Sequence, residues 1–292
     1  MDSIVNFYRF THVADPHRIA RWLRARCRGT EIKGTVHVAA EGINAALWGS
    51  EGMLRNLVAD IEDALAIDLP NAEWSHVGEC EPFKRLRIRA KDEILRFAVS
   101  ALDPTLETGE RVATRDWNAM LEAPDVTVVD VRNRYEVAIG NVDGAVDSSI
   151  ESFGEFAQFV ARDLSKHAHT RVALYCTGGI RCEKASAYLL EWGFQEVYQL
   201  DGGILGYLSD ISPEGTRWRG ECFVFDHRVS LTSALEPAEH VLCHGCRRPV
   251  APTDTQSEDY REGVHCAQCI GELTDAQRRG FEERRRQMHG AS

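Results

Sequence analysis

The segment that most constrains the fold is residues 172–192, where an apolar run, a glycine-containing turn and a helical pattern follow one another directly. The turn begins at Cys176 and closes at Arg181, and Gly178 and Gly179 allow its backbone to curl with successive N–H groups pointing inward. The first turn of the following helix adds unpaired N–H groups and the positive end of its dipole. Such a turn favours an anion at its centre. It predicts a Cys176 thiol with a lowered pKa and a fixed positive charge on Arg181 at the rim.

A cysteine at the end of a strand is most often structural, but here the cysteine, the glycines, the arginine and the helix start occur together. We therefore predict that Cys176 is a reactive thiol. The rest of its loop comprises Thr177, Gly178, Gly179 and Ile180. Cys182, one residue past Arg181, is either a resolving or sulfur-relay thiol or a packing residue. Asp130 and Arg132 follow an earlier apolar run, and we expect them to hold that strand end and the loop by hydrogen bonds.

Two α/β domains are predicted from the order of short strands and amphipathic helices. In residues 1–100 the order is β-α-β-β-α-β with one extra strand, which is typical of a ferredoxin-like α/β sandwich. Its first helix has Asp15 as a plausible N-cap, Pro16 in the first turn and Gly29 at its end. In residues 112–213 buried strands alternate with helices, which predicts a parallel sheet covered on both faces, with its site at the carboxyl ends of the strands. Residues 100–114 resemble a linker.

The tail, residues 216–292, begins with a strand-like run at 222–230 and then contains two Cys-x-x-Cys pairs separated by 19 residues. The pairs are Cys243 with Cys246 and Cys266 with Cys269. This spacing predicts a structural Zn²⁺ site with four thiolate ligands and no open position for a catalytic water. Gly245 would ease the tight turn of the first pair. His244 and His265 are spare ligands if one thiolate is missing, but we expect them to be exposed bystanders. Nine cysteines in all, with no recognisable export signal, are better explained by metal ligation, one reactive thiol and packing than by disulfides.

The charge of the chain is unevenly distributed. The formal net charge of −11, taken whole, argues against a protein that coats nucleic acid or anionic membranes. However, residues 106–215 carry 18 acidic and 9 basic side chains, whereas residues 1–105 carry 15 and 14. The basic side chains of the first domain gather on a strand and a helix, at Lys84, Arg85, Arg87, Arg89, Lys91, Arg21 and Arg28. They predict a surface for RNA phosphates, with Lys84 on the other side of the strand from the next four.

No apolar run approaches the roughly 20 residues that span a bilayer, so we expect a cytoplasmic protein with no membrane partner. DNA is not expected as a partner either. Nothing in the sequence indicates the oligomeric state.

The turn Cys176-Thr-Gly-Gly-Ile-Arg181 resembles the active loop of rhodanese domains. It has four residues between cysteine and arginine, whereas tyrosine phosphatases have five, so it suits a persulfide sulfur better than a phosphoryl group. Residues 129–145 and 200–207 resemble the first and last signatures of that fold. With residues 36–45, 82–94 and 222–229, nearly the whole chain resembles the rhodanese-related tRNA uridine 5-hydroxylases.

This resemblance implies an oxidoreductase that uses molecular oxygen to hydroxylate C5 of the wobble uridine in the anticodon loop of tRNA, giving 5-hydroxyuridine. Cys176 would be its active-site cysteine, with Arg181 in the loop. Two alternatives are open. One is a sulfurtransferase carrying a persulfide on Cys176, and the other is a non-catalytic docking module. The sequence contains no flavin or nicotinamide fingerprint and no recognisable iron site, so it does not indicate the electron donor or the tRNA species.

Overall fold

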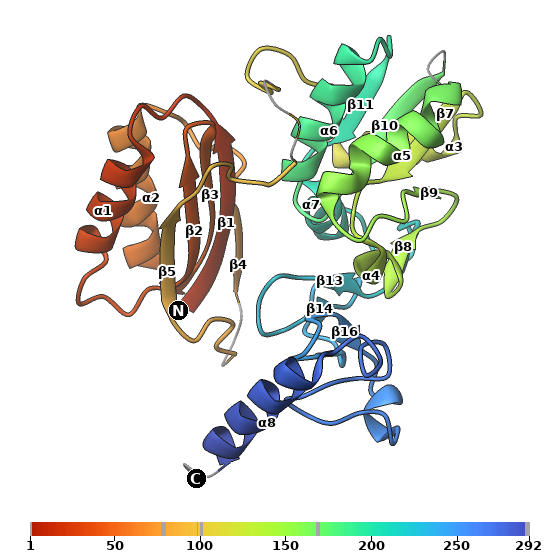
Figure 1. Cartoon of the computed structure of the whole chain (residues 1–292). Helices are drawn as coiled ribbons and strands as arrows, with labels where there is room; N and C mark the ends of the chain where they lie inside the picture. Colours follow the sequence, from red (N-terminus) through yellow and green to blue (C-terminus); the bar gives the residue numbers. More distant parts are fainter. Residues whose placement is uncertain (1, 77–79, 98, 100–101, 168–169, 290–292) are drawn as a thin grey trace.

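The computed structural model describes residues 2–76, 80–97, 99, 102–167 and 170–289. They form an N-terminal α/β sandwich, a central parallel α/β domain and a small tail that ends in a helix (Figure 1). No helix within these ranges has the length and apolar character needed to cross a membrane.

The N-terminal domain has one sheet covered on one face by two helices. Its elements are β1 (Asp2–Phe10), α1 (Pro16–Arg26), β2 (Lys33–Ala39), β3 (Gly42–Ser50), α2 (Glu51–Leu65), β4 (Glu73–His76) and β5 (Leu86–Ala90). The strand order is β4-β1-β3-β2-β5, in which β2 and β5 are parallel and the other neighbours antiparallel. This is the predicted ferredoxin-like sandwich with one extra strand. The Asp15 carboxylate accepts a hydrogen bond from the Arg18 N–H, and Gly29 has a φ of +77°, so both predicted ends of the first helix are confirmed.

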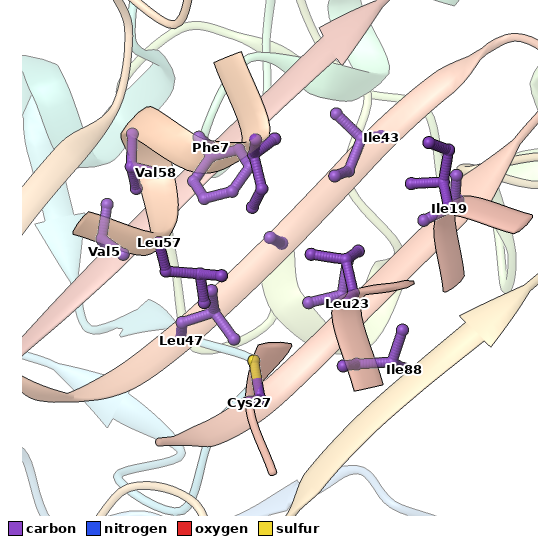
Figure 2. Close-up of a cluster of buried hydrophobic side chains, with 14 of the residues drawn as sticks. Val5, Phe7, Ile19, Leu23, Cys27, Ile43, Leu47, Leu57, Val58 and Ile88 are labelled. Atoms are coloured by element: carbon purple, nitrogen blue, oxygen red, sulfur yellow. The ribbon is translucent and has the colours of Figure 1, made fainter. Parts of the chain in front are cut away.

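Only one face of this sheet is buried by its helices. Alternate strand residues such as Val5, Phe7, Leu47 and Ile88 pack against Leu23 and its neighbours in a hydrophobic core (Figure 2). The residues between them point to the opposite face, which looks toward the central domain and the tail (Figure 1). The open face is therefore the side of this domain that faces the rest of the chain.

The central domain has a five-stranded parallel sheet in the order β6-β11-β10-β7-β9. Its strands are β6 (Glu110–Val112), β7 (Val126–Asp130), β9 (Val146–Asp147), β10 (Arg171–Tyr175) and β11 (Val197–Leu200). Its α-helices are α3 (Trp117–Glu122), α4 (Arg134–Val137), α5 (Phe156–Arg162), α6 (Ile180–Glu191) and α7 (Gly203–Asp210). Short 3-10 turns lie at Thr114–Asp116, Phe153–Glu155 and Leu164–His167. Helices α5 and α6 pack on one face of the sheet and α3 and α7 on the other, as predicted for a parallel sheet.

The predicted linker contributes to the central domain. Residues 110–112, inside the expected linker, form the edge strand β6, which pairs in parallel with β11. Just before the linker, Phe97 is 1% exposed and stacks on Phe153, with Tyr188 at its edge. A three-residue strand is too short to produce a periodic pattern, which explains why the sequence did not indicate it. The expected domain boundary at residue 100 lies outside the described residues.

The predicted strand at residues 222–230 is wrong. This segment is a hairpin of two short strands, β13 (Cys222–Phe223) and β14 (Ser230–Leu231). The turn forms because the Asp226 carboxylate accepts a hydrogen bond from the Arg228 N–H and because Val229 adopts a left-handed φ of +64°. The strand prediction rested on the apolar pattern, which does not show that the Asp226 side chain accepts this backbone hydrogen bond.

The start of the tail belongs to the core of the central domain. Strand β12 (Trp218–Gly220) pairs with β8 (Gly140–Val142), and the Trp218 and Cys222 side chains are buried there. The rest contains β15 (Val241–Leu242) paired with β16 (Pro249–Val250), a 3-10 turn at Asp254–Gln256 and the polar helix α8 (Asp275–His289). The expected tail boundary at residue 216 therefore does not separate two independent cores.

Candidate active site around Cys176

Cys176 lies at the carboxyl end of β10, the middle strand of the central sheet, and α6 begins four residues later. The Gly179 N–H donates to the Cys176 Sγ at 3.1 Å, so the loop curls around the sulfur as predicted. Gly179 needs to be glycine because its φ is +90°. Gly178 has no such φ and has open space where a Cβ would lie, so of the two glycines only Gly179 is required by the backbone conformation of the loop.

The environment of Cys176 favours the thiolate. Burial alone would raise the pKa of Cys176, which is 1% exposed. The Cys182 thiol as hydrogen-bond donor, the Arg181 charge and the backbone N–H groups of Arg181 and Cys182 outweigh burial and lower the pKa to about 6. Burial and the Cys176 sulfur together hold the pKa of Cys182 well above its usual value. At neutral pH Cys176 is therefore a thiolate and Cys182 a neutral thiol beside it.

Arg181 is not a rim charge, as the sequence suggested, because it is only 5% exposed. Its guanidinium forms a two-pronged ion pair with the Glu136 carboxylate at 3.0 and 2.7 Å, and it also donates to Thr177 Oγ1 at 3.2 Å. Glu136, on the short helix α4, is fully buried. The pair lets a full positive charge exist inside the domain next to the thiolate. Glu136 is not among the predicted site residues.

Asp130 and Arg132 join the neighbouring strand ends. The Arg132 guanidinium donates to both Asp130 carboxylate oxygens, at 3.0 and 2.6 Å, and to the Gly140 carbonyl at 2.7 Å. Both side chains are buried, and the Arg132 guanidinium also lies over the Trp218 ring. These bonds fix the end of β7 against β8, next to the loop.

The N-terminal domain covers the loop and the helix that follows it. The Tyr8 hydroxyl donates to Glu183 at 3.1 Å and would lie 2.9 Å from a Cβ at Gly179. On α6, Lys184 is 2% exposed and pairs with Glu41 and Glu93 of the N-terminal domain at 2.8 and 2.9 Å. None of these residues was predicted. A charged side chain is rarely so buried, and only the packing of the two domains accounts for it here.

Glu73, on β4, is a second group near the thiolate that the sequence did not reveal. Its carboxylate oxygen lies 3.2 Å from the Cβ position of Gly202, at the start of α7, whose Ile204 N–H donates to the Cys176 carbonyl at 2.9 Å. Burial, then the Cys176 charge and then Asp201, raise the pKa of Glu73 to about 8. Its side chain has no hydrogen bond or ion pair among the residues described. At neutral pH Glu73 is thus a carboxylic acid that senses the charge of the Cys176 thiolate.

The predicted RNA-binding cations fall on two different surfaces. Arg85, Arg87, Arg89 and Lys91 are exposed, as is Lys84, and none forms an ion pair within the described ranges. Arg87 and Arg89 alternate with the buried Ile88 and so project from the open face of the sheet. Arg21 and Arg28 are exposed on the α1 side, which covers the other face. The strand and the helix therefore do not form one basic surface.

The four tail cysteines meet at one point. Cys243, Cys246, Cys266 and Cys269 place their Sγ atoms within 4.8 Å of one another. The shortest Sγ–Sγ distances are 3.8 to 3.9 Å, far longer than a disulfide bond. Four sulfurs at about 2.3 Å from one tetrahedral Zn²⁺ would be about 3.8 Å apart. These residues could hold a metal ion.

The neighbours of this cysteine cluster behave largely as expected. A Cβ on Gly245 would meet the Val264 carbonyl at 2.5 Å, so the first knuckle requires glycine. His244 is exposed, as expected, but His265 is buried, and its Nδ1 lies 2.9 Å from the Asp259 carbonyl oxygen. Neither histidine is in the cluster.

Comparison with known proteins identifies the family. Family models match residues 3–94 as a UPF0176 acylphosphatase like domain and residues 114–210 as a Rhodanese-like domain. A tRNA uridine(34) hydroxylase of Teredinibacter turnerae is 43% identical over 289 residues, which cover 99% of this chain and 90% of that protein. The chain belongs to the tRNA uridine(34) hydroxylase family. Proteins of the same name from Acaryochloris marina and Brucella ovis are 41% and 40% identical, cover 97% and 98% of this chain, and are themselves covered to 91% and 93%.

The resemblance inferred from the cysteine loop and its flanking segments is thus confirmed, and the chain is a hydroxylase-family enzyme of the oxidoreductase type. A solved rhodanese-related protein of Thermoplasma volcanium is 19% identical and covers 36% of this chain and 95% of that one, with a TM-score of 0.30. In this member of the tRNA uridine(34) hydroxylases, the site described above combines a buried thiolate, a paired arginine and a carboxylic acid contributed by the N-terminal domain.

Proposed function

We propose that this chain hydroxylates C5 of uridine 34 in tRNA and forms 5-hydroxyuridine with molecular oxygen as co-substrate. The observation that carries the proposal is the Cys176 thiolate, held by the loop N–H groups in a chain that matches tRNA uridine(34) hydroxylases over almost its full length. The cytoplasm, where tRNA is used, is the expected location.

The thiolate suits attack on the uracil ring. Cys176 Sγ would add to C6, forming an S–C6 bond and moving negative charge onto C5 and the C4 carbonyl oxygen. Glu73, protonated at neutral pH, would donate a hydrogen bond to that oxygen. C5 would then take an oxygen atom at the peroxide level, lose its proton and expel the thiolate. Overall, uridine, O₂, two electrons and two protons give 5-hydroxyuridine and water, with the electrons supplied by an external reductant.

Access to the sulfur requires movement. Cys176 is 1% exposed, and Tyr8 lies against Gly179 in the same loop. Uracil reaches Sγ only after groups around the loop move and the base leaves its stack. Unstacking costs least for an unpaired base, and the wobble position lies in a single-stranded loop.

The test of the function is nucleoside analysis of tRNA from a bacterial strain that lacks its own uridine 34 hydroxylating enzymes. Expression of this chain should restore 5-hydroxyuridine at position 34, detected by mass spectrometry. The sulfurtransferase alternative uses the same Cys176 loop, because the persulfide anion Sγ–S⁻ would also be bound by the N–H groups of that loop. Thiosulfate-to-cyanide turnover, with a mass gain of one sulfur on Cys176 and no 5-hydroxyuridine, would favour that alternative and refute the hydroxylase.

The open face of the N-terminal sheet is our candidate for holding tRNA phosphates. Replacing Arg85, Arg87 and Arg89 with glutamate should raise the Kd for tRNA about 10- to 100-fold and flatten its salt dependence, because phosphate contacts release counterions. The matched control is Arg21→Glu with Arg28→Glu, which changes charge on the α1 side and should have little effect. Equal losses in both variants, measured by filter binding across a salt series, would contradict this location.

The pH dependence should report the two titrating groups. The reaction needs Cys176 ionised and Glu73 protonated, so the rate should rise through about pH 6 and fall above about pH 8. Glu73→Gln cannot ionise, so it should lose the alkaline limb and keep the acid limb. Single-turnover rates from pH 5 to 9 measure this. An unchanged alkaline limb in the variant would exclude Glu73 as its source.

We propose Zn²⁺ as the ion of the tail cysteine cluster, with a structural role. Four thiolates would fill its coordination sphere and fold a polar segment around it. Metal analysis of the purified chain should give one zinc per chain, and Cys243→Ser should lower it. Chelation should expose residues 241–273 to proteolysis and leave the central domain intact. A zinc-free chain with the same cleavage pattern would refute the assignment.

A further inference from the structure

Phe225 is an apolar side chain that stays 63% exposed beside the active loop. The guanidinium carbon of Arg181 lies over the Phe225 ring, 5.8 Å from its centroid. Arg181 also closes the loop that begins at Cys176, so one arginine contacts both the thiolate environment and this ring. Single exposed apolar side chains are common on protein surfaces. The case for a function therefore depends on how Phe225 is held and on what surrounds it.

The hairpin turn holds Phe225 in a fixed position. Arg228 pairs with both carboxylate oxygens of Asp226, at 3.0 and 2.6 Å, and these two side chains are only 6% and 7% exposed. Behind the turn, the Phe223 ring meets Phe225 edge-on at 5.1 Å and Tyr135 at 5.2 Å. A buried ion pair and an aromatic cluster thus support a ring that is itself left largely in solvent.

Cations from two other parts of the chain act on His227 in this turn. The His227 N–H donates to the Pro82 carbonyl at 2.9 Å, which brings the β4–β5 loop and its Lys84 to the hairpin. Burial lowers the pKa of His227, and the nearby charges of Lys84 and Arg247 lower it further. Lys84 and Arg247 are exposed and form no ion pair in the part of the chain that the structure describes. The carboxylate of Asp226 is already neutralised by its own arginine.

An exposed aromatic ring on a turn whose His227 lies near unpaired cations matches the chemistry of single-stranded nucleic acid. Every base presents a π-face that stacks on an aromatic side chain, while lysine and arginine neutralise the adjacent phosphates. The Arg181 guanidinium beside the ring adds a cation–π contribution. We propose that Phe225 is a stacking platform for an unpaired nucleobase of the RNA substrate, next to the Cys176 loop. This inference rests on the proposed tRNA substrate and identifies how its loop is held.

The first experiment measures binding of an anticodon stem-loop RNA containing U34. Phe225→Leu should raise its Kd about 5- to 150-fold, the loss that corresponds to one base–aromatic stack, whereas Phe225→Trp should bind close to wild type. Trp192→Leu is the matched control, because Trp192 is another exposed aromatic, at 46%, outside this hairpin. Circular dichroism and thermal melting verify folding, which replacement of an exposed side chain should not disturb. Wild-type affinity in Phe225→Leu would overturn the proposal.

The second experiment identifies the stacked base by asking whether removal of one base from the RNA and removal of the Phe225 ring have coupled effects on binding. Stem-loops with an abasic site at position 33, 34 or 35 are bound to wild type and to Phe225→Leu. At the stacked position the abasic site should weaken wild type but not the variant. If each abasic site weakens RNA binding equally in wild type and in Phe225→Leu at all three positions, the proposal is overturned. If coupling is found while the wild type makes no 5-hydroxyuridine, the platform stands and the hydroxylase assignment fails. If 5-hydroxyuridine forms without coupling, only the platform fails.

Discussion

Replacement of Cys176 by serine should reduce 5-hydroxyuridine formation about 10³-fold or more. The change replaces only the sulfur atom by oxygen, so the side chain keeps nearly the same volume. A serine hydroxyl does not ionise near neutral pH, whereas the pKa of Cys176 is about 6. Without a thiolate there is no nucleophile for C6, and loss of a nucleophile typically costs several orders of magnitude in rate. The measurement is single-turnover conversion of tRNA, quantified by nucleoside mass spectrometry.

The control separates this chemistry from general damage to cysteines. Cys80→Ser replaces a thiol in the β4–β5 loop, outside the active loop, and should keep wild-type activity. Binding of tRNA to Cys176→Ser should also be unchanged, because the predicted phosphate contacts lie on the N-terminal sheet. Wild-type levels of 5-hydroxyuridine with Cys176→Ser would remove Cys176 from the mechanism altogether, even if the family assignment stands.

The parts of the site that the sequence predicted correctly depend on residues close together along the chain. The Cys176 loop is six consecutive residues after an apolar strand, so its curl and its N–H groups follow from local geometry. The cysteine cluster is encoded by spacing, because each Cys-x-x-Cys pair presents two sulfurs to one ion. Asp15 and Gly29 mark the ends of the first helix by capping rules that act over one turn.

The parts that the sequence did not reveal depend on how distant elements pack. Glu136 lies 45 positions before its partner Arg181, and Tyr8 lies 175 positions before Glu183. No periodic pattern identifies such pairs, since they depend on strand order and on the docking of one domain against another. For the same reason Arg181 was expected at the rim, although its charge is buried. Glu73 shows no signal at all in sequence, because its pKa is raised by burial, by the Cys176 charge and by Asp201, all of which only folding brings to it.

Loss of the buried ion pair between Glu136 and Arg181 should also strongly destabilise the central domain. Glu136→Gln keeps the size and shape of the side chain but removes its charge. Among the residues that the structure describes, it leaves the Arg181 guanidinium, 5% exposed, with no anionic partner other than the Cys176 thiolate. Removing one member of a buried pair typically costs about 3–5 kcal/mol, because the remaining charge is desolvated and uncompensated. The free energy of unfolding of the central domain at pH 7 should fall by about that amount.

Urea unfolding followed by tryptophan fluorescence measures this change, since Trp117 and Trp218 are buried in the central domain. The matched control is Glu122→Gln, which removes the same charge from an exposed pair with Arg217 and should cost at most about 1 kcal/mol. A double variant, Glu136→Gln with Arg181→Met, should recover much of the lost stability, because it no longer buries an unpaired charge. If Glu136→Gln lowers the free energy of unfolding no more than the control does, Arg181 is solvated in solution. The buried environment described for the Cys176 thiolate would then be wrong.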